Sequence, residues 1–155
     1  MAQYTGEQGA FTPSTSQDNW TLDGNAAGVG NLGMVKMISW GGNGTTSIGY
    51  RTRWCRPTTV GSGAFTALTT QATSPATTAV LRYGTFATAP ILPTDPANLF
   101  AQNWNVLGGG GVIVLPIGGE WMVVGITAAA NGQISCRNTV GTDASLSSYG
   151  VQWAE

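Results

Sequence analysis

Residues 48–55 alternate between two kinds of side chain, and this pattern constrains the fold more than any other feature of the sequence. Apolar side chains or a threonine occupy every second position, while glycine, arginine and cysteine occupy the positions between them. A repeat of two residues is typical of a β-strand whose two faces meet different surroundings. We therefore predict a strand that ends before Pro57. Its two faces are Ile48, Tyr50, Thr52 and Trp54, and Gly49, Arg51, Arg53 and Cys55.

Short apolar runs recur along the chain, separated by turn residues such as glycine, proline and asparagine. Turn signals at intervals of roughly 8–12 residues are typical of antiparallel sandwiches and jelly rolls. Asn131-Gly132 is a strong signal for a two-residue hairpin. We predict an all-β fold, an antiparallel β-sandwich or jelly-roll-like single domain. The other predicted strands are 34–40, 79–86, 99–106, 111–115, 120–127, 133–138 and 148–154.

The first 33 residues differ from the rest, because they are polar and glycine-rich and show no useful periodicity. Phe11 and Trp20 stand in this segment as isolated apolar anchors and are candidate contacts with another subunit or the capsid. Such a segment buries too little apolar surface to offset an ordering entropy of more than about 1 kcal/mol per residue. We therefore expect residues 1–33 to form an extended N-terminal arm that a neighbouring subunit orders. Residues 34–155 are expected to form the β-sandwich domain.

Charge is scarce along the whole chain. Only 8% of the residues are charged, where an ordinary domain has roughly 25%. The net charge is −1 and there is no histidine, the usual general acid–base residue and the commonest metal ligand. A chain of this charge has no field that attracts nucleic acid or an anionic membrane. We therefore predict a soluble protein that has neither kind of partner, and that associates readily with its own copies.

Two glycine-rich segments invite comparison with nucleotide-binding motifs. Gly28–Gly33 matches the pattern GxGxxG. The dinucleotide motif follows a strand and opens a helix, whereas this segment leads into the predicted strand 34–40. A phosphate-binding loop would be followed by a lysine and a helix, and neither signal follows Gly108–Gly111. We interpret these glycines as a place where two backbones approach closely. We predict no bound cofactor.

The seven acidic residues do not form a recognisable catalytic or metal-binding pattern. A carbohydrate hydrolase needs two facing carboxylates about 5–9.5 Å apart, and only Glu120 begins a strong predicted strand. We therefore predict a protein that is not an enzyme and holds no catalytic metal. A calcium site remains an alternative, with Asp18, Asn19, Asp23 and Asn25 as its ligands. The spacing of these residues matches no standard calcium-binding loop.

The two cysteines, Cys55 and Cys136, lie in similar contexts, each followed by an arginine. Disulfides are rare in proteins made in a cytoplasm. We therefore predict free, buried thiols, with a disulfide between neighbouring strands as the alternative. A catalytic cysteine is not expected, because there is no histidine to activate it.

Two groups of residues are candidate contacts with another subunit. Arg51, Arg53 and Arg56 place half of the six basic residues within six positions, and the planar guanidinium suits interface pairing. The alternative is the solvent-facing side of a strand. Trp20 and Trp104 are flanked by polar residues, which fits an interface anchor, packing within the subunit, or a platform for stacking a sugar ring.

These features together resemble the small virion structural proteins of tailed bacteriophages, in particular head decoration (cement) proteins. The resemblance lies in the short all-β chain rich in threonine, glycine and alanine, the polar segment 1–33 and β-hairpins such as 111–125. It implies a homotrimer that sits over junctions between major capsid subunits, in a virion assembled in the host cytoplasm. It implies no particular site residue. A receptor-binding module of a phage fibre or spike, which recognises cell-surface glycan, is the alternative function.

Overall fold

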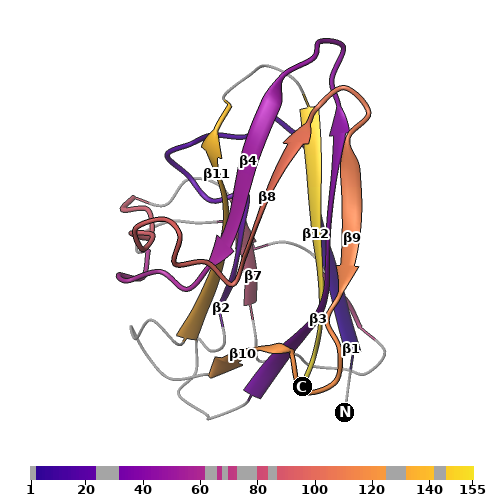
Figure 1. Cartoon of the computed structure of the whole chain (residues 1–155). Helices are drawn as coiled ribbons and strands as arrows, with labels where there is room; N and C mark the ends of the chain where they lie inside the picture. The colour runs from indigo at the N-terminus through magenta and orange to yellow at the C-terminus, as the bar shows by residue number, and fades with distance from the viewer. Residues whose placement is uncertain are drawn as a thin grey trace.

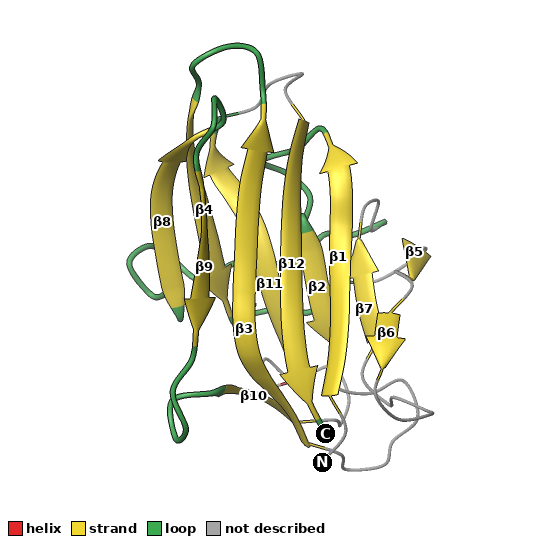
Figure 2. Ribbon diagram, turned by 90° about the vertical axis from the view of Figure 1, so that its right-hand side faces the viewer, coloured by secondary structure: helices red, strands yellow, loops and turns green. Residues whose placement is uncertain are grey.

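The computed structural model describes residues 3–23, 32–61, 66–67, 70–72, 80–83, 87–124, 132–141 and 146–155. These residues form two six-stranded antiparallel sheets that face each other as a sandwich (Figures 1 and 2). The prediction of an all-β sandwich is confirmed, and the described residues include no α-helix. The jelly-roll connectivity stays a prediction.

Sheet A has the strand order β10-β3-β12-β1-β6, and β9 also pairs with β3. Because β10 pairs with residues 32–35 and β9 with residues 37–41, these two strands follow one another along the same edge of β3. Figure 2 looks onto the outer face of this sheet. Its strands are β1 (Gln3–Phe11), β3 (Leu32–Asn43), β6 (Thr70–Ala72), β9 (Gly110–Val114), β10 (Trp121–Val124) and β12 (Leu146–Ala154).

Sheet B has the order β5-β7-β2-β11-β4-β8. Its central strand β11 pairs with β4 on one side and β2 on the other. The described strands on either side of Asn131-Gly132, β10 and β11, lie in different sheets, and Asn131 itself lies outside the described residues, so the hairpin there stays a prediction. The strands are β2 (Trp20–Asp23), β4 (Gly49–Cys55), β5 (Thr66–Ala67), β7 (Val80–Tyr83), β8 (Phe100–Asn105) and β11 (Gln133–Val140).

The N-terminal segment is part of both sheets, which corrects the expectation of an extended arm over residues 1–33. Strand β1 lies between β12 and β6 in sheet A, and β2 lies between β11 and β7 in sheet B. The Tyr4 ring is 2% exposed and stacks on Trp153 at 5.5 Å. A few apolar residues suffice to hold β1 and β2 in place, because the strands on both sides pair with their backbone N–H and C=O groups and supply most of the apolar surface. Residues 24–31 lie outside the described part of the chain.

The space between the sheets is filled mainly by aromatic side chains. Trp20, Trp54 and Trp153 have no exposed surface, and Trp40 packs against Trp54 with ring centroids 5.3 Å apart. The alternation predicted for residues 48–55 is confirmed, because β4 turns Tyr50, Thr52 and Trp54 into this core. Large rings from both sheets therefore bury most of the apolar surface that holds the sandwich together.

Two connections between the sheets lie side by side at one end of the sandwich. The Gly42 amide donates to the Gly109 carbonyl at 2.9 Å, and the Gly44 amide donates to the Val106 carbonyl at 3.2 Å. A Cβ atom on Gly42 would lie 2.2 Å from the Val106 carbonyl oxygen, and one on Gly109 would lie 2.0 Å from the Asn105 carbonyl oxygen. The glycines of the run 108–111 thus permit a close approach of backbones, as predicted.

The placement of β1 predicts the effect of a single substitution. Tyr4→Ala should lower the free energy of unfolding by about 3 kcal/mol, because it removes a buried ring and leaves a cavity beside Trp153. Thr5→Ala is the matched control, since Thr5 is exposed on the same strand, and it should change stability by less than about 0.5 kcal/mol. Denaturant unfolding measures both. Equal stability of the two variants would restore the view of this segment as a peripheral arm.

Candidate functional site

Arginines hold a long loop over the outer face of sheet B. The Arg53 Nη2 atom donates to the Pro93 carbonyl at 2.8 Å, and its Nε atom donates to Asn98. The Arg137 Nη2 atom donates to the Pro90 carbonyl at 2.8 Å. Both side chains face away from the core, yet they are only 6% and 8% exposed. Residues 87–98 therefore cover this face, and the loop is visible beside β4 and β8 on the side away from sheet A (Figure 1).

The three arginines predicted as a contact strip have partners inside the subunit. Arg53 holds the loop, and Arg51 forms an ion pair with Asp95 at 2.7 Å. Hydrogen bonds from Asn98 and Arg51 lower the pKa of the Asp95 carboxyl below its usual value. Arg56 donates to the backbone carbonyl of Met122. A contact of these arginines with another subunit stays a prediction, but the structure already explains their clustering through these internal bonds.

A buried ion pair fixes the start of β2 against β11. The Arg137 Nη2 atom lies 2.6 Å from the Asp18 carboxylate, and the Thr21 hydroxyl donates to the same carboxylate at 2.6 Å. Burial raises the pKa of Asp18, and the charge of Arg137 opposes that rise. The described residues contain no group of three acidic, cysteine or histidine side chains that could hold a metal ion. The bonds of Asp18 to Arg137 and Thr21 hold the start of β2 against β11.

A polar cluster lies in the interior, between the two sheets. The Asn138 Oδ1 atom accepts hydrogen bonds from Asn19 at 3.1 Å, from Thr52 at 2.8 Å and from the Tyr149 hydroxyl at 2.7 Å. The indole of Trp104 in turn donates to the Thr52 hydroxyl at 2.9 Å. Tyr149 belongs to sheet A, whereas Asn138 and Thr52 belong to sheet B. Asn138 thus joins the two sheets through one amide oxygen.

The predicted aromatic anchors are mostly internal. Trp20 has no exposed surface, so its side chain is not available as an interface anchor or a sugar platform. Trp104 is partly buried and meets the rings of Tyr50 and Tyr149 edge-on at 5.2 and 6.0 Å. Phe11 is also partly buried, with its ring 5.8 Å from Tyr149. Packing within the subunit, one of the interpretations offered for the tryptophans, accounts for these rings.

Both cysteines are free and buried, as predicted. They occupy neighbouring strands, with Cys136 opposite Trp54 and Cys55 opposite Ser135. Since successive residues of a strand face opposite sides of the sheet, the two thiols point away from each other and do not form a disulfide. Burial raises the pKa of Cys55 to about 11 and that of Cys136 well above its usual value, so both thiols are protonated at neutral pH.

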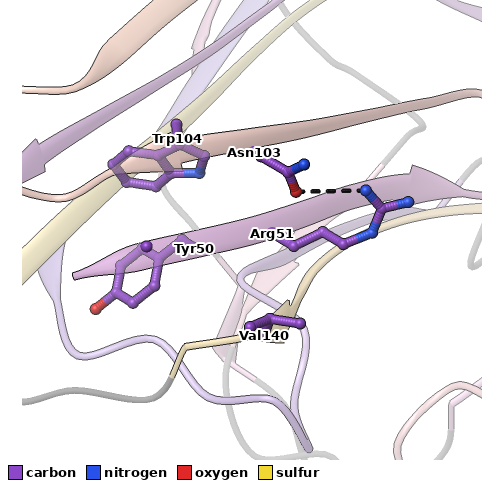
Figure 3. A pocket seen from close by; sticks show the side chains of 6 residues that line it. Tyr50, Arg51, Asn103, Trp104 and Val140 are labelled. Atoms are coloured by element: carbon purple, nitrogen blue, oxygen red, sulfur yellow. Dashed lines mark hydrogen bonds between the residues drawn. The ribbon is translucent and has the colours of Figure 1, made fainter.

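A shallow hollow of about 250 Å³ opens at the end of sheet B where β4 begins and β8 ends. Figure 3 shows Tyr50 and Trp104 on one side of it and Arg51 with Asn103 on the other, while Val140 lies at the border. The Arg51 Nη1 atom donates to Asn103 at 3.3 Å. The aromatic rings are already engaged with each other, so the hollow offers a ligand mainly apolar edges and one guanidinium.

The outer face of sheet A differs from that of sheet B, because it is nearly uncharged. Glu7 and Lys36 are the only charged residues in its six strands, and Lys36 pairs with Glu120 at 2.6 Å. One row across four strands reads Val112, Ser39, Gly150 and Glu7, and the next reads Val114, Met37, Gln152 and Thr5.

Small residues keep the middle of this face flat. A Cβ atom on Gly150 would lie 2.5 Å from the hydroxyl oxygen of Ser39, so a larger side chain at that position would displace its neighbour. Serine, glycine and glutamine dominate the centre, whereas apolar side chains gather at the edge formed by β9 and β10. The sheet A face is therefore flat, rich in uncharged hydrogen-bonding groups, and apolar along one side.

Four of the exposed large hydrophobic residues of the described chain lie along the apolar side of the sheet A face. Val112 and Val114 are 60% and 71% exposed, Met122 is 47% exposed, and Ile117 in the turn between β9 and β10 is 99% exposed. Exposed apolar groups that lie together mark interaction surfaces more often than isolated ones do. Sequence reasoning missed this surface because residues 111–115 were treated as an ordinary strand, although consecutive apolar residues place apolar groups on both of its faces.

Comparison with protein-family models, with curated proteins and with solved structures found no match to this chain. Within the described segments, no helix has the length and apolar character needed to cross a bilayer.

The interior cluster predicts a large effect for one amide. Asn138→Ala should lower the free energy of unfolding by about 3 kcal/mol, because the donors of Asn19, Thr52 and Tyr149 lose their common acceptor in a buried place. Asn103→Ala is the matched control on the exposed side of β8, with an expected change below about 0.5 kcal/mol. Thermal and denaturant unfolding report both values. A change in Asn138→Ala as small as that in the control would rule out the amide as a link between the sheets.

Proposed function

We propose that this protein is a non-enzymatic structural subunit of a virus particle, a capsid decoration or cement protein of the tailed-bacteriophage type. The observation that carries the proposal is the sheet A face, which is flat, nearly uncharged and apolar along β9 and β10. In the proposed role this face lies on the outer surface of the head, across a junction between major capsid subunits. The outer face of sheet B, with its loop, then points to solvent.

The chemistry of the face suits a permanent protein contact. Burying an ion is costly unless it is paired and hydrogen-bonded, whereas hydroxyl and amide groups lose less solvation and find partners more easily. The exposed valines and Met122 supply apolar surface worth roughly 25 cal/mol per Å² removed from water. Covering the whole face with another protein removes the most apolar surface from water, which favours permanent attachment to a particle.

The alternative function, recognition of cell-surface glycan by a fibre or spike module, has less support. Sugar-binding sites generally present an aromatic face to solvent for stacking. Trp20 lies in the core, and Trp104 is engaged by Tyr50, Tyr149 and Thr52. The hollow beside Trp104 is shallow, and Arg51 in it is already paired with Asp95.

Two matched substitutions test which surface meets the capsid. Thr5→Glu adds a carboxylate to the exposed sheet A face, and Thr94→Glu adds one to the exposed loop over sheet B. We expect Thr5→Glu to weaken binding to virus heads at least tenfold, because an unpaired charge would be buried, at a cost above about 1.4 kcal/mol. Thr94→Glu should bind like the natural protein.

Co-sedimentation with purified heads that lack this protein measures both affinities, and unchanged melting temperatures show that both variants are folded. If the natural protein does not sediment with the heads, the proposed function is wrong. If Thr94→Glu alone loses binding, the attachment surface lies on the loop side.

A further inference from the structure

In the part of the chain that the structure describes, strand β9 lies at an edge of sheet A. Among the described strands it pairs only with β3. The Leu115 amide donates to the Lys36 carbonyl at 2.8 Å, and the Gly109 carbonyl accepts from the Gly42 amide at 2.9 Å, so the odd-numbered residues direct their backbone groups toward β3. Because backbone direction alternates along a strand, Gly110, Val112 and Val114 direct their N–H and C=O groups toward the open edge. Figure 2 shows β9 beside β3 at the margin of the sheet.

Within residues 110–114, and among the described residues, this edge shows none of the devices that usually protect an edge strand from pairing. Natural edges carry a lysine or another charge, a proline, a bulge or a covering loop. Residues 96–119 contain no charged residue, and β9 pairs with β3 in regular register over residues 110–114. The side chains of Val112 and Val114 are also exposed. Both the backbone and the side chains of β9 therefore present an attractive surface for another strand.

We propose that two copies of this chain associate through β9, which pairs with the β9 strand of the second copy in antiparallel fashion about a two-fold axis. Sheet A then continues from one copy into the other. A two-fold axis at Val112 places Val112 opposite Val112 of the second copy, and Val114 opposite its Gly110. The three residues that face the edge then exchange about six backbone hydrogen bonds.

A second copy suits this edge because the edge is complementary to itself. Gly110 has no side chain, so it leaves room for the exposed Val114 of the other copy. No charges oppose each other, since β9 has none and the whole chain carries a net charge of −1. Pro116 has no amide to donate, so it limits the pairing to residues 110–114. The association is two-fold, whereas the trimer implied by the resemblance would need a different surface.

Two variants of one exposed residue test this proposal. Val112→Lys places two like charges opposite each other at the axis, and Val112→Pro removes the amide that would bond to the second copy. An edge strand tolerates either change in the isolated subunit. Thr94→Lys on the exposed loop over sheet B is the matched control. Sedimentation equilibrium at micromolar concentrations gives the mass of each variant without virus heads, so the result does not depend on the proposed function.

We expect the natural protein and Thr94→Lys to have a mass of roughly 32 kDa, twice the 16.0 kDa of one chain. Both Val112 variants should dissociate at least tenfold more readily. Circular dichroism identifies an unfolded variant. In that event, hydrogen exchange of the natural protein decides, because the amides of Val112 and Val114 should become more protected as concentration rises. A monomeric or trimeric natural protein, or a dimer whose Val112 amide exchanges freely at all concentrations, overturns the proposal.

Discussion

The arrangement of the two sheets depends on the hydrogen bonds that the amide oxygen of Asn138 accepts. This oxygen accepts three hydrogen bonds in a core that is otherwise filled with aromatic rings, and one of the three donors, Tyr149, comes from the opposite sheet. Aromatic packing supplies most of the stabilisation but tolerates small shifts. A buried polar cluster that must satisfy several groups at once specifies a single arrangement. The placement of β11 against β12 is therefore set by polar groups, and the rings fill the space around them.

The two sheets divide charge between them. The strands of sheet B contain four arginines, Arg51, Arg53, Arg82 and Arg137, and three of these make the described bonds to Asp18 or to the loop over that face. Sheet A contains Glu7 and Lys36 alone. Most of the described charges thus serve to hold the subunit together, and the sheet A face carries only Glu7 and Lys36. This division explains how so little charge can coexist with an ordered fold and a broad, nearly uncharged face.

Local patterns in the sequence predicted the fold class but not the partners of individual residues. The alternation in β4 was found because it depends on neighbours in the sequence, whereas the free thiols were predicted from the rarity of disulfides in proteins made in a cytoplasm. Because Asp18 and Asn19 precede Trp20, its sequence context left open an interface anchor, packing within the subunit or a sugar-stacking platform. Both polar residues are in fact buried against Arg137 and Asn138. These partners lie 119 residues further along the chain, and no local pattern reveals them. Strand β1 was missed because its inward side has few apolar residues of its own. The strands that flank it, β12 and β6, also come from distant parts of the sequence.

We propose that this protein attaches through the sheet A face and not through the loop-covered face of sheet B. Hydroxyl-radical footprinting of the protein on virus heads and free in solution tests it directly, because three methionines, Met34, Met37 and Met122, lie in β3 and β10 of sheet A. If the sheet A face is the attachment surface, oxidation of Met37 and Met122 should fall several-fold on the heads. Oxidation of Ile91, exposed in the loop over sheet B, should stay unchanged. Protection of Ile91 without protection of the methionines would contradict attachment through the sheet A face.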